Sequence, residues 1–397
     1  MEENKLTSNK INSMFIHLLR SAITQKKLDA CYDISLEDSE RLFKIAKAHD
    51  LAHLVGYAID KNAINIEPKV AIAFQNEQFS AVGRYENSNY ELNAICECFE
   101  NAQIPFVPLK GSVIRDLYIE PWLRTSSDID ILVKKEDLER AIKSLITQLE
   151  YKKEGGSGHD VSLFSPSGVH LELHFELIDK ESEVSNADKP LERVWEYVSV
   201  VEGKKYQMAM SEDMFYYYHV AHAAKHFILG GCGIRPLIDE YVLNCQQNID
   251  EEGRLKLLKE GDLQKFEKHF KDLTNVWFDK NEYNATTRAM SNYLLEGGVY
   301  GNVTNLVTVG GIRKGGKFKY IMSRIWLPFK LLPESANPKS KKWLIPFYQM
   351  KRWLRVIFTG RGKRALNEIK FNAKGTSTAE CSNLEQMIKE LGFLTKK

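Results

Sequence analysis

The stretch DIDILV, residues 128–133, decides how the centre of this chain folds. Its alternation of acidic and branched aliphatic residues has the period of two that is typical of a β-strand with one buried face. A strand with this period places Asp128 and Asp130 on one face and Ile129, Ile131 and Val133 on the other. The sequence therefore predicts a strand that directs two carboxylates towards one point in space.

Two neighbouring carboxylates repel each other, so each resists ionisation unless a cation lies between them or they share a proton. A divalent metal ion with oxygen ligands is the simplest compensation. The alternative interpretation is a solvated edge strand that carries two exposed acids. Features before and after the strand favour the metal ion.

The segment FVPLKGSVIRDLY, residues 106–118, carries the first of these features. A short predicted strand runs through Lys110, Gly111 and Ser112 into a predicted helix. Backbone N–H groups at a helix start bind anions, and a glycine lets a ligand approach the backbone closely. This turn, Lys110 to Ser112, is therefore a predicted phosphate site, and we name it the phosphate turn.

The segment VHLELHF, residues 169–175, is a further predicted strand. Its alternation places His170, Glu172 and His174 on the face opposite its aliphatic residues. Glu172 would complete a metal site of three carboxylates. His174 either orients that carboxylate or is a partly buried structural histidine.

Four segments in this order resemble a known family: FVPLKGSVIRDLY, LRTSSDIDILV at 123–133, HLELHFEL at 170–177 and HVAHAAKH at 219–226. Their pattern is similar to that of the bacterial uncharacterised nucleotidyltransferase family, which belongs to the polymerase-β-type nucleotidyltransferase superfamily. The resemblance implies an α+β fold. Its polymerase-β-like core, a small mixed sheet with helices, would be flanked by helical N- and C-terminal regions.

The resemblance also implies an enzyme that moves a nucleoside monophosphate from an NTP to a hydroxyl- or phosphate-bearing acceptor and releases pyrophosphate. ATP is the expected donor. Gly111 and Ser112 would bind the β and γ phosphates, and Asp128 and Asp130 would coordinate two Mg²⁺ or Mn²⁺ ions. Glu172 would bind the second ion or act as base on the acceptor hydroxyl. Two such ions clamp the attacking and leaving oxygens of an in-line displacement.

Six basic residues, His174 among them, are further candidates for nucleotide binding. Lys110 and Arg124 either neutralise charge on the triphosphate or pair with acids of the protein. His222, Lys225 and His226 lie on one predicted helix, where the histidines share one side. They form either a cationic wall that faces the nucleotide or acceptor, or a polar stripe between domains. No acid or thiol at a fixed spacing supports a zinc site there.

The pattern along the chain predicts four regions. Apolar residues at helical spacing predict helices before residue 104, and short apolar runs bounded by Pro and Gly then predict a sheet. Strand signals fade after about residue 185. We therefore predict a helical N-terminal region at 1–103, the nucleotidyltransferase core at 104–188, a helical C-terminal domain at 189–312 and a basic, Trp-containing extension at 313–397.

Basic residues gather between 313 and 370, where Lys and Arg greatly outnumber the only two acids and three Trp are interleaved. This composition suits an amphipathic helix on an anionic membrane surface. It also suits a basic helix packed on the core of the protein or, less well, a nucleic-acid groove. A last amphipathic helix is predicted to have its N-cap at Ser382 or Asn383.

The whole chain of 397 residues has 43% hydrophobic residues and a formal net charge of +2, an ordinary globular composition. Its six cysteines are scattered and form no CxxC pair, so we expect reduced thiols in a cytoplasm. The polar N-terminus lacks the layout of a signal peptide, and no run of about 18 apolar residues predicts a membrane span. We expect a cytoplasmic protein, peripheral to the membrane if its basic segment binds lipid.

The acceptor is not visible in the sequence, because one fold serves many substrates. A small molecule or a protein side chain is favoured over RNA, since no recognisable RNA-binding module is present. The rival interpretation is a non-catalytic NTP-binding sensor or scaffold that keeps the fold, with or without a membrane surface.

Overall fold

The computed structural model describes residues 2–28, 34–177, 186–299, 301–329, 332, 341–358 and 378–394. The chain divides into two compact units. The first contains residues 1–179, 185–222 and 234–282, and the second contains residues 180–184, 223–233 and 283–397. The four regions predicted from the sequence have other boundaries, and these stay predictions.

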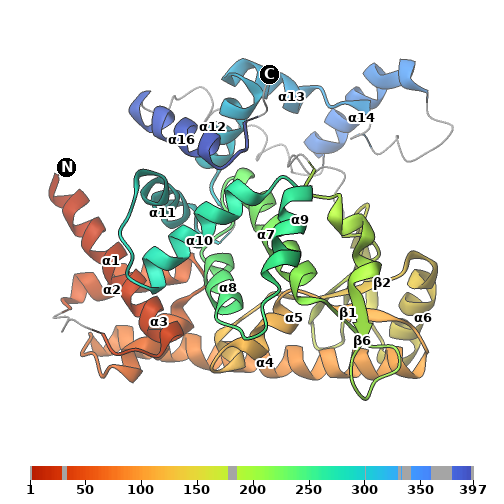
Figure 1. Cartoon of the computed structure of the whole chain (residues 1–397), viewed down its shortest axis with the longest axis horizontal. Coiled ribbons are helices and arrows are strands. Elements are labelled where there is room, and N and C mark those ends of the chain that lie inside the picture. The colour runs from red at the N-terminus through yellow and green to blue at the C-terminus, as the bar shows by residue number, and fades with distance from the viewer. Residues whose placement is uncertain are drawn as a thin grey trace. The chain divides into compact units, whose positions relative to one another are not determined.

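The first unit begins with four helices: α1 (Glu2–Thr24), α2 (Leu36–Ala48), α3 (Ala52–Lys61) and α4 (Pro68–Asn101) (Figure 1). The side chain of Ser35 caps α2 by accepting a hydrogen bond from the N–H of Asp38. Pro68 opens α4, where its missing N–H costs no intrahelical bond, and the helix then continues for 34 residues. The helices predicted before residue 104 are confirmed.

A five-stranded mixed sheet follows, in the order β1-β2-β5-β4-β3. Its strands are β1 (Phe106–Pro108), β2 (Asp128–Val133), β3 (Lys152–Gly156), β4 (Asp160–Phe164) and β5 (His170–His174). β2 and β5 are parallel, and every other pair in this sheet is antiparallel. The predicted strands β1, β2 and β5 are confirmed, and the α+β fold class with them.

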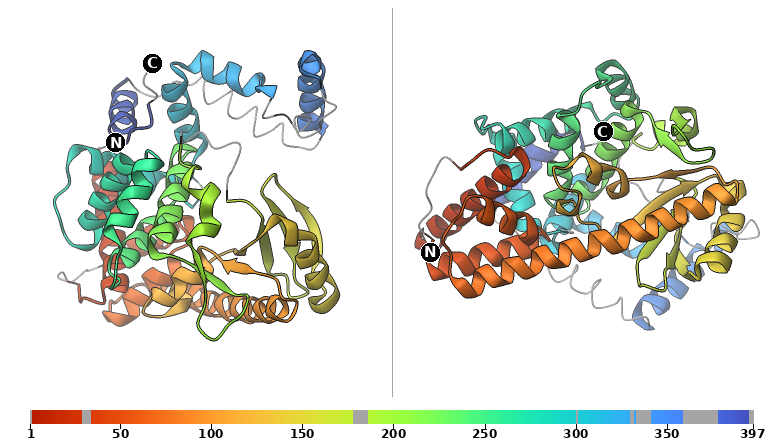
Figure 2. Two further views of the ribbon diagram at one scale, coloured as in Figure 1. Left: turned by 45° about the vertical axis from the view of Figure 1, so that its right-hand side comes forward. Right: turned by 90° about the horizontal axis from the view of Figure 1, so that it is seen from below.

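One face of this sheet forms the core of the first unit. Ile129, Ile131, Leu171 and Leu173 are fully buried there. They pack with apolar residues of α4 and of α6 (Leu138–Leu149), which lie beside the sheet (Figure 2). The opposite face carries the acids and histidines of β2 and β5, together with Leu132.

Other parts of the first unit differ from the sequence-based expectation. The hairpin of β3 and β4 was not predicted, nor was a second hairpin formed by β6 (Val198–Val200) and β7 (Met208–Met210). The helix expected after the phosphate turn is short: α5 (Gly111–Ile114) continues only as the 3₁₀ turn η1 (Arg115–Leu117). It therefore offers less of a helix dipole than the prediction assumed.

The first unit is completed by the 3₁₀ segments η2 (Pro121–Leu123), η3 (Lys135–Asp137) and η4 (Pro190–Tyr197), and by the helices α8 (Arg235–Asn244), α9 (Glu251–Glu260) and α10 (Gln264–Phe278). α7 (Glu212–Ile228) begins in the first unit and ends in the second, since the division falls between His222 and Ala223. α8 packs against α10.

The second unit contains α11 (Ala285–Gly297), α12 (Val303–Lys314), α13 (Lys317–Ile325), η7 (Lys342–Leu344), α14 (Ile345–Phe358) and α16 (Thr378–Glu390). α12 packs against α13, and α16 packs against α11 and α12. The predicted N-cap at Ser382 or Asn383 is wrong, because α16 begins at Thr378 and includes both residues. Among the described helices, none is long and apolar enough to cross a membrane.

Candidate active site

Three carboxylates and two histidines meet on the polar face of β2 and β5. The parallel register sets Asp128 opposite His170 and Asp130 opposite Glu172. One ligand atom from each of Asp128, His170 and Glu172 lies within 4.8 Å of the others, and the same holds for Asp130, Glu172 and His174. Glu172 belongs to both sets, so it lies between the two acids of β2.

Asp130 is buried, with 4% of its surface exposed, and β2 lies between β1 and β5, so the alternative of a solvated edge strand with two exposed acids is wrong. The Lys110 ammonium and Nε2 of His174 each lie 2.8 Å from its Oδ1. Burial alone would raise the pKa of Asp130, but Lys110 and His174 outweigh it and hold that pKa far below its usual range. Asp130 is therefore ionised and already carries two donors on one oxygen.

His174 contacts Asp130 more closely than Glu172, whose Oε2 lies 3.6 Å from its Nε2. Burial lowers the pKa of His174, yet the two carboxylates outweigh burial and raise that pKa above its ordinary value. Its Nδ1 is buried and has no hydrogen-bond partner among the residues that the structure describes. The sequence predicts that His174 either orients Glu172 or is structural. The structure adds a third role, a bond to Asp130.

Asp128 has the opposite electrostatic environment from Asp130. Burial and the neighbouring charge of Asp130 raise the pKa of Asp128 above its ordinary value, and Lys110 offsets this only in part. A carboxyl group in this state is stabilised in its charged form by a further cation. The donor set of three carboxylates suits a hard divalent cation such as Mg²⁺ or Mn²⁺, which prefers oxygen ligands.

The turn between β1 and α5 has an unusual backbone. Lys110 has φ 44° and ψ −121°, a conformation that residues with a Cβ rarely adopt. A Cβ on Gly111 would lie 3.2 Å from the side chain of Ser126 and 3.3 Å from a nitrogen of Arg124. The turn is therefore strained at one residue and tightly packed at the next, a combination found at functional sites.

Ser112 is 7% exposed, and its hydroxyl has no hydrogen-bond partner among the described residues. Its backbone N–H donates to the carbonyl of Leu109 at 3.1 Å and so is not open to a ligand in this conformation. An unsatisfied buried hydroxyl costs free energy unless a ligand or water satisfies it. The hydroxyl, rather than the N–H, is the donor that Ser112 can offer to a phosphate.

Two residues that the sequence did not single out complete the surroundings of this turn. Tyr218 of α7 is buried, and its hydroxyl is hydrogen-bonded to the Lys110 ammonium. Burial lowers the pKa of Lys110, but Tyr218 and Asp130 outweigh burial and raise it above its usual range. Lys110 is therefore held between α7 and β2 and pairs with an acid, one of its two predicted roles.

Arg115 is the second such residue. It is 2% exposed, donates from Nε to the carbonyl of Gly111 at 2.8 Å and from a terminal nitrogen to Ser126 at 3.2 Å. Within the described residues, no carboxylate lies within 4.0 Å of its guanidinium. The carbonyl of Gly111 thus accepts a hydrogen bond from a buried cation that no described carboxylate contacts.

Arg124 pairs with an acid from α8. Its Nε and a terminal nitrogen bind both oxygens of Asp239, at 2.8 to 3.1 Å, and Tyr118 donates to the same carboxylate at 2.7 Å. Its other terminal nitrogen donates to the carbonyl of Thr125 at 2.6 Å. Arg124 lies against Gly111, but Asp239 takes up its charge, so its geometry favours positioning of the turn over direct binding of phosphate.

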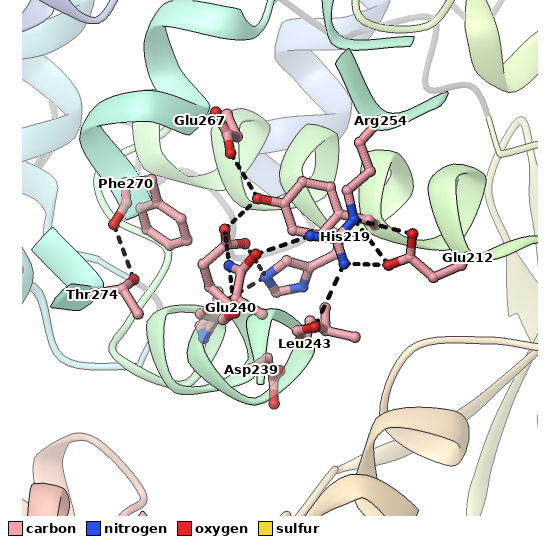
Figure 3. A network of polar contacts seen from close by, with 12 residues as sticks. Glu212, His219, Asp239, Glu240, Leu243, Arg254, Glu267, Phe270 and Thr274 are labelled. Carbon is pink, nitrogen blue, oxygen red and sulfur yellow. Dashed lines mark hydrogen bonds and ion pairs between the residues drawn. The ribbon is translucent and has the colours of Figure 1, made fainter. Parts of the chain in front are cut away.

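α7 is anchored to its neighbours by a buried polar network (Figure 3). Tyr216 donates to Glu240 at 2.5 Å and lies 2.8 Å from Glu267, while its ring is stacked under Arg254. Nε2 of His219 lies 3.1 Å from the carbonyl of Pro236. These contacts link Tyr216 and His219 to α8, α9 and α10 and fix the helix that carries Tyr218.

The remaining predicted residues lie further along α7. The ring of His222 lies 6.2 Å from that of Tyr218, one helical turn away. Lys225 and His226 follow on the part of α7 that belongs to the second unit. All three are partly exposed, and their predicted role at the nucleotide stays a prediction.

A cavity of about 900 Å³ lies between α4, the β6–β7 hairpin and the phosphate turn. Ser112 and Arg115 line it, whereas Asp128, Asp130 and Glu172 do not. The cavity therefore adjoins the turn without reaching the three carboxylates.

Comparison with known proteins agrees with this geometry. No curated protein and no solved structure gives a match to the chain. A family model described as "Uncharacterised nucleotidyltransferase" matches residues 35–279, which include β1 to β7 and the carboxylates of β2 and β5. Since this match covers more than half of the 397 residues, the chain belongs to this nucleotidyltransferase family.

Proposed function

We propose that the protein transfers a nucleoside monophosphate from an NTP, with ATP as the expected donor, to a hydroxyl- or phosphate-bearing acceptor. The reaction centre is formed by Asp128, Asp130 and Glu172. The observation that supports it best is the parallel register of β2 and β5, which gathers three carboxylates on one polar face. Membership of a nucleotidyltransferase family supports the reaction class and the NTP substrate.

These carboxylates would hold Mg²⁺ or Mn²⁺, since hard divalent cations take oxygen ligands. Bound there, the ions supply charge neutralisation at the phosphates and activation of the attacking oxygen. Asp130 is ionised in the structure, whereas burial and the charge of Asp130 raise the pKa of Asp128, and a nearby cation would lower it. The electrostatics of β2 thus favour a divalent cation.

In the proposed step an acceptor oxygen attacks the α-phosphorus and forms a new O–P bond. The bond from the α-phosphorus to the bridging oxygen breaks, and pyrophosphate leaves with the electron pair. The acceptor proton passes to a base. Glu172 is suited to this role, because its side chain is 31% exposed whereas that of Asp130 is 4% exposed.

We assign the triphosphate to the turn at Lys110, Gly111 and Ser112. The Ser112 hydroxyl is buried without a partner among described residues, and Lys110 carries a permanent charge beside Asp130. Fixed donors and cations of this kind stabilise charge that develops on phosphate oxygens. His222, Lys225 and His226 are proposed to contact the nucleotide or the acceptor from α7.

A small molecule or a protein side chain is the favoured acceptor, and nucleic acid is less favoured. We also propose a cytoplasmic location, peripheral to a membrane. Cys96, Cys98, Cys232 and Cys245 are free thiols, which is consistent with a reducing compartment. The basic C-terminal helices supply the membrane contact.

The test is transfer of label from each of the four α-labelled NTPs, with Mg²⁺ or Mn²⁺, to the small molecules and proteins of a cell extract. Wild type is compared with Asp128→Asn/Asp130→Asn. The matched control is Glu136→Gln/Glu139→Gln, which removes two exposed acids just after β2. We expect label from wild type and control only.

Other outcomes separate the alternatives. NTP binding by wild type without label transfer would favour the non-catalytic sensor. Equal labelling by wild type and the Asp128→Asn/Asp130→Asn variant would remove the carboxylates from the reaction. The absence of NTP binding would contradict the assignment of the triphosphate site.

A further inference from the structure

The helix α14 presents an apolar stripe to solvent. Trp343, which precedes it in η7, is 74% exposed, and Phe347, Met350 and Leu354 are 56%, 54% and 48% exposed. Their spacing of four, three and four residues places all four on one side of a helix. Single exposed apolar residues are ordinary, but a row of four large ones marks an interaction surface.

α13 has a similar stripe. Phe318 is 74% exposed, Met322 is 44% exposed, and Trp326, directly after the helix, is 51% exposed. These residues are four apart and therefore follow one side of the helix. α13 and α14 belong to the same compact unit, so the two stripes can be considered together.

The opposite side of α14 packs against the end of α13 and the residues that follow it. Tyr348 and Gln349 are buried, and Gln349 donates to the carbonyl of Leu327 at 2.6 Å. Arg352 and Trp353 donate to the carbonyl of Ile325, at 3.2 and 3.1 Å. The side chains of α14 that pack on the end of α13 are thus distinct from its stripe, which the described residues leave exposed.

The part of the chain that contains α13 and α14 is strongly basic. Residues 313–370 contain 16 Lys and Arg but two acids, whereas the remaining residues contain 39 Lys and Arg and 51 acids. Lys319, Arg324, Lys341, Lys351 and Arg355 are exposed on or beside α13 and α14. The apolar stripes are therefore bordered by positive charge, while the rest of the chain is net negative.

We propose that α13, η7 and α14 form a membrane-docking face that binds anionic phospholipid. Aromatic and aliphatic side chains would enter the boundary between headgroups and acyl chains, and the bordering cations would contact lipid phosphates. The proposal gives the peripheral location a lipid class and a surface. It does not depend on nucleotidyl transfer.

Charge complementarity decides between this partner and two others. A symmetric contact with a second copy of the chain would bring two strongly basic faces together, and this part of the chain has almost no acids to pair them. A nucleic-acid groove places its cations along the middle of the surface, with aromatic rings between them. Here continuous apolar rows occupy the middle, which fits a lipid interface.

The experiment is flotation of the full-length protein with vesicles. One set contains phosphatidylcholine alone, and the other contains phosphatidylcholine and phosphatidylglycerol in about equal amounts, so that the second carries the negative surface potential of an anionic leaflet. We expect wild type to float with the second set only. Binding should weaken in about 1 M NaCl, where the Debye length is about 3 Å.

Two variants test the face. Trp343→Ser/Phe347→Ser removes two exposed rings, and Lys319→Glu/Lys341→Glu reverses two exposed charges. Each should weaken flotation by about tenfold or more, because apolar burial and electrostatic attraction both contribute to interfacial binding. Both variants should keep the circular dichroism spectrum and the thermal unfolding midpoint of wild type, which shows that they fold.

Matched controls lie in the first unit. Phe79→Ser/Tyr90→Ser removes two rings of α4 that are 75% and 72% exposed, and Lys143→Glu/Lys153→Glu reverses two exposed charges on α6 and β3. Both controls should float like wild type. Loss of flotation in a control, or retention in both test variants, would contradict the assignment of the face.

Two further outcomes would overturn the lipid partner. Sedimentation without vesicles could show a wild-type dimer that Trp343→Ser/Phe347→Ser converts to monomer, which would make the stripe a contact between copies. Binding of a labelled single-stranded RNA that Lys319→Glu/Lys341→Glu abolishes, together with no flotation of wild type, would assign the face to nucleic acid.

Discussion

Lys110 combines a rare backbone conformation with a buried ion pair. Its φ of 44° lies in the region that favours glycine, yet its ammonium is needed 2.8 Å from Asp130. A residue that keeps such a conformation without being glycine stores strain, which persists where the side chain has a function. The backbone at this position therefore favours glycine, whereas the ion pair with Asp130 requires lysine.

Two substitutions at Lys110 separate these preferences. Lys110→Gly should leave the protein about 1 kcal/mol more stable than Lys110→Ala, since only alanine retains the Cβ that disfavours this φ. Both variants should lose nucleotidyl transfer to the same extent, because both lack the ammonium. Urea unfolding and initial rates measure the two effects. Equal stability would show that the turn relaxes at no cost, and unequal rates would mean that strain itself contributes to activity.

Glu172 lies between the two acids of β2, and its side chain is more accessible than that of Asp130. Glu172→Gln keeps the shape of the side chain but removes a charge from the proposed metal site. We expect kcat/KM to fall by at least about a hundredfold, because a metal ion contributes several kcal/mol of transition-state stabilisation.

The control for Glu172 is Glu176→Gln, two residues beyond β5, whose carboxylate pairs with exposed Lys135 at 3.1 Å. Calorimetric titration with Mn²⁺ should show weaker binding by Glu172→Gln and unchanged binding by Glu176→Gln. Unchanged binding by both would assign the metal to other ligands.

Among the helices, α8 determines where the segment before β2 lies. Asp239 binds Arg124 through both carboxylate oxygens, and Arg235 reaches Asp50 at 2.6 Å and the hydroxyl of Thr125 at 3.3 Å. One helix thus supplies the partners of two consecutive residues that lead into the Asp-x-Asp strand. Arg124 in turn lies against Gly111.

We therefore expect Asp239→Asn to act on the site from a distance. The substitution leaves the charge of buried Arg124 unpaired, which should cost about 3 kcal/mol of stability. Nucleotidyl transfer should fall mainly through kcat, because the phosphate turn loses its packing rather than its ligand groups. Glu260→Gln breaks the exposed pair with Arg193 and should cost less than about 1 kcal/mol.

Thermal unfolding and steady-state kinetics measure both variants. A stability loss in Asp239→Asn without any change in kcat would mean that the Arg124 pair is structural alone.

For the molecule as a whole, one buried acid makes stability depend on pH. Glu240 is fully buried, and burial raises its pKa from 4.5 to about 7. The single proton of the Tyr216 hydroxyl cannot be donated to both Glu240 and Glu267, although both carboxylates lie within 2.8 Å (Figure 3). A proton on Glu240 satisfies this network.

The sign of the effect follows from proton linkage. Below about pH 4.5 Glu240 is protonated in the folded and the unfolded protein and contributes no pH dependence. Between about pH 4.5 and 7 the folded state binds more protons, so the free energy of unfolding falls as the pH rises. A shift from 4.5 to about 7 corresponds to about 3 kcal/mol, reached near neutral pH and constant above it.

Glu240→Gln replaces the titrating group by an amide that resembles its protonated form. Urea unfolding across this pH range should show the variant gaining stability relative to wild type by about 3 kcal/mol. Glu252→Gln, an exposed acid of α9, should show no such trend. A constant difference between wild type and Glu240→Gln at every pH would show that another group binds the proton.

Much of this fold is readable from local pattern. The alternation in DIDILV and HLELHF predicts β2 and β5, and the face that holds Asp128, Asp130 and Glu172 follows from it. β3, with its sequence KKEGG, is fully exposed and has no alternation, so no sequence signal marks it. β6 and β7 have three residues each, too few for a period to be recognised.

The chain by itself determined which side chains are acidic, which strand face each occupies and the order of motifs that indicates a nucleotidyltransferase. The tertiary structure alone decided the parallel pairing of β2 with β5, which sets Glu172 beside Asp130. It also decided the contacts with Lys110 and His174 that keep Asp130 ionised, and the burial that opposes charge on Asp128. It also decided that Tyr218, Arg115 and Asp239 support the phosphate turn. The physical reason is that periodicity reports only on neighbours along the chain. Electrostatic environment depends instead on groups that are distant in sequence, such as Arg124 and Asp239, which are separated by 115 positions.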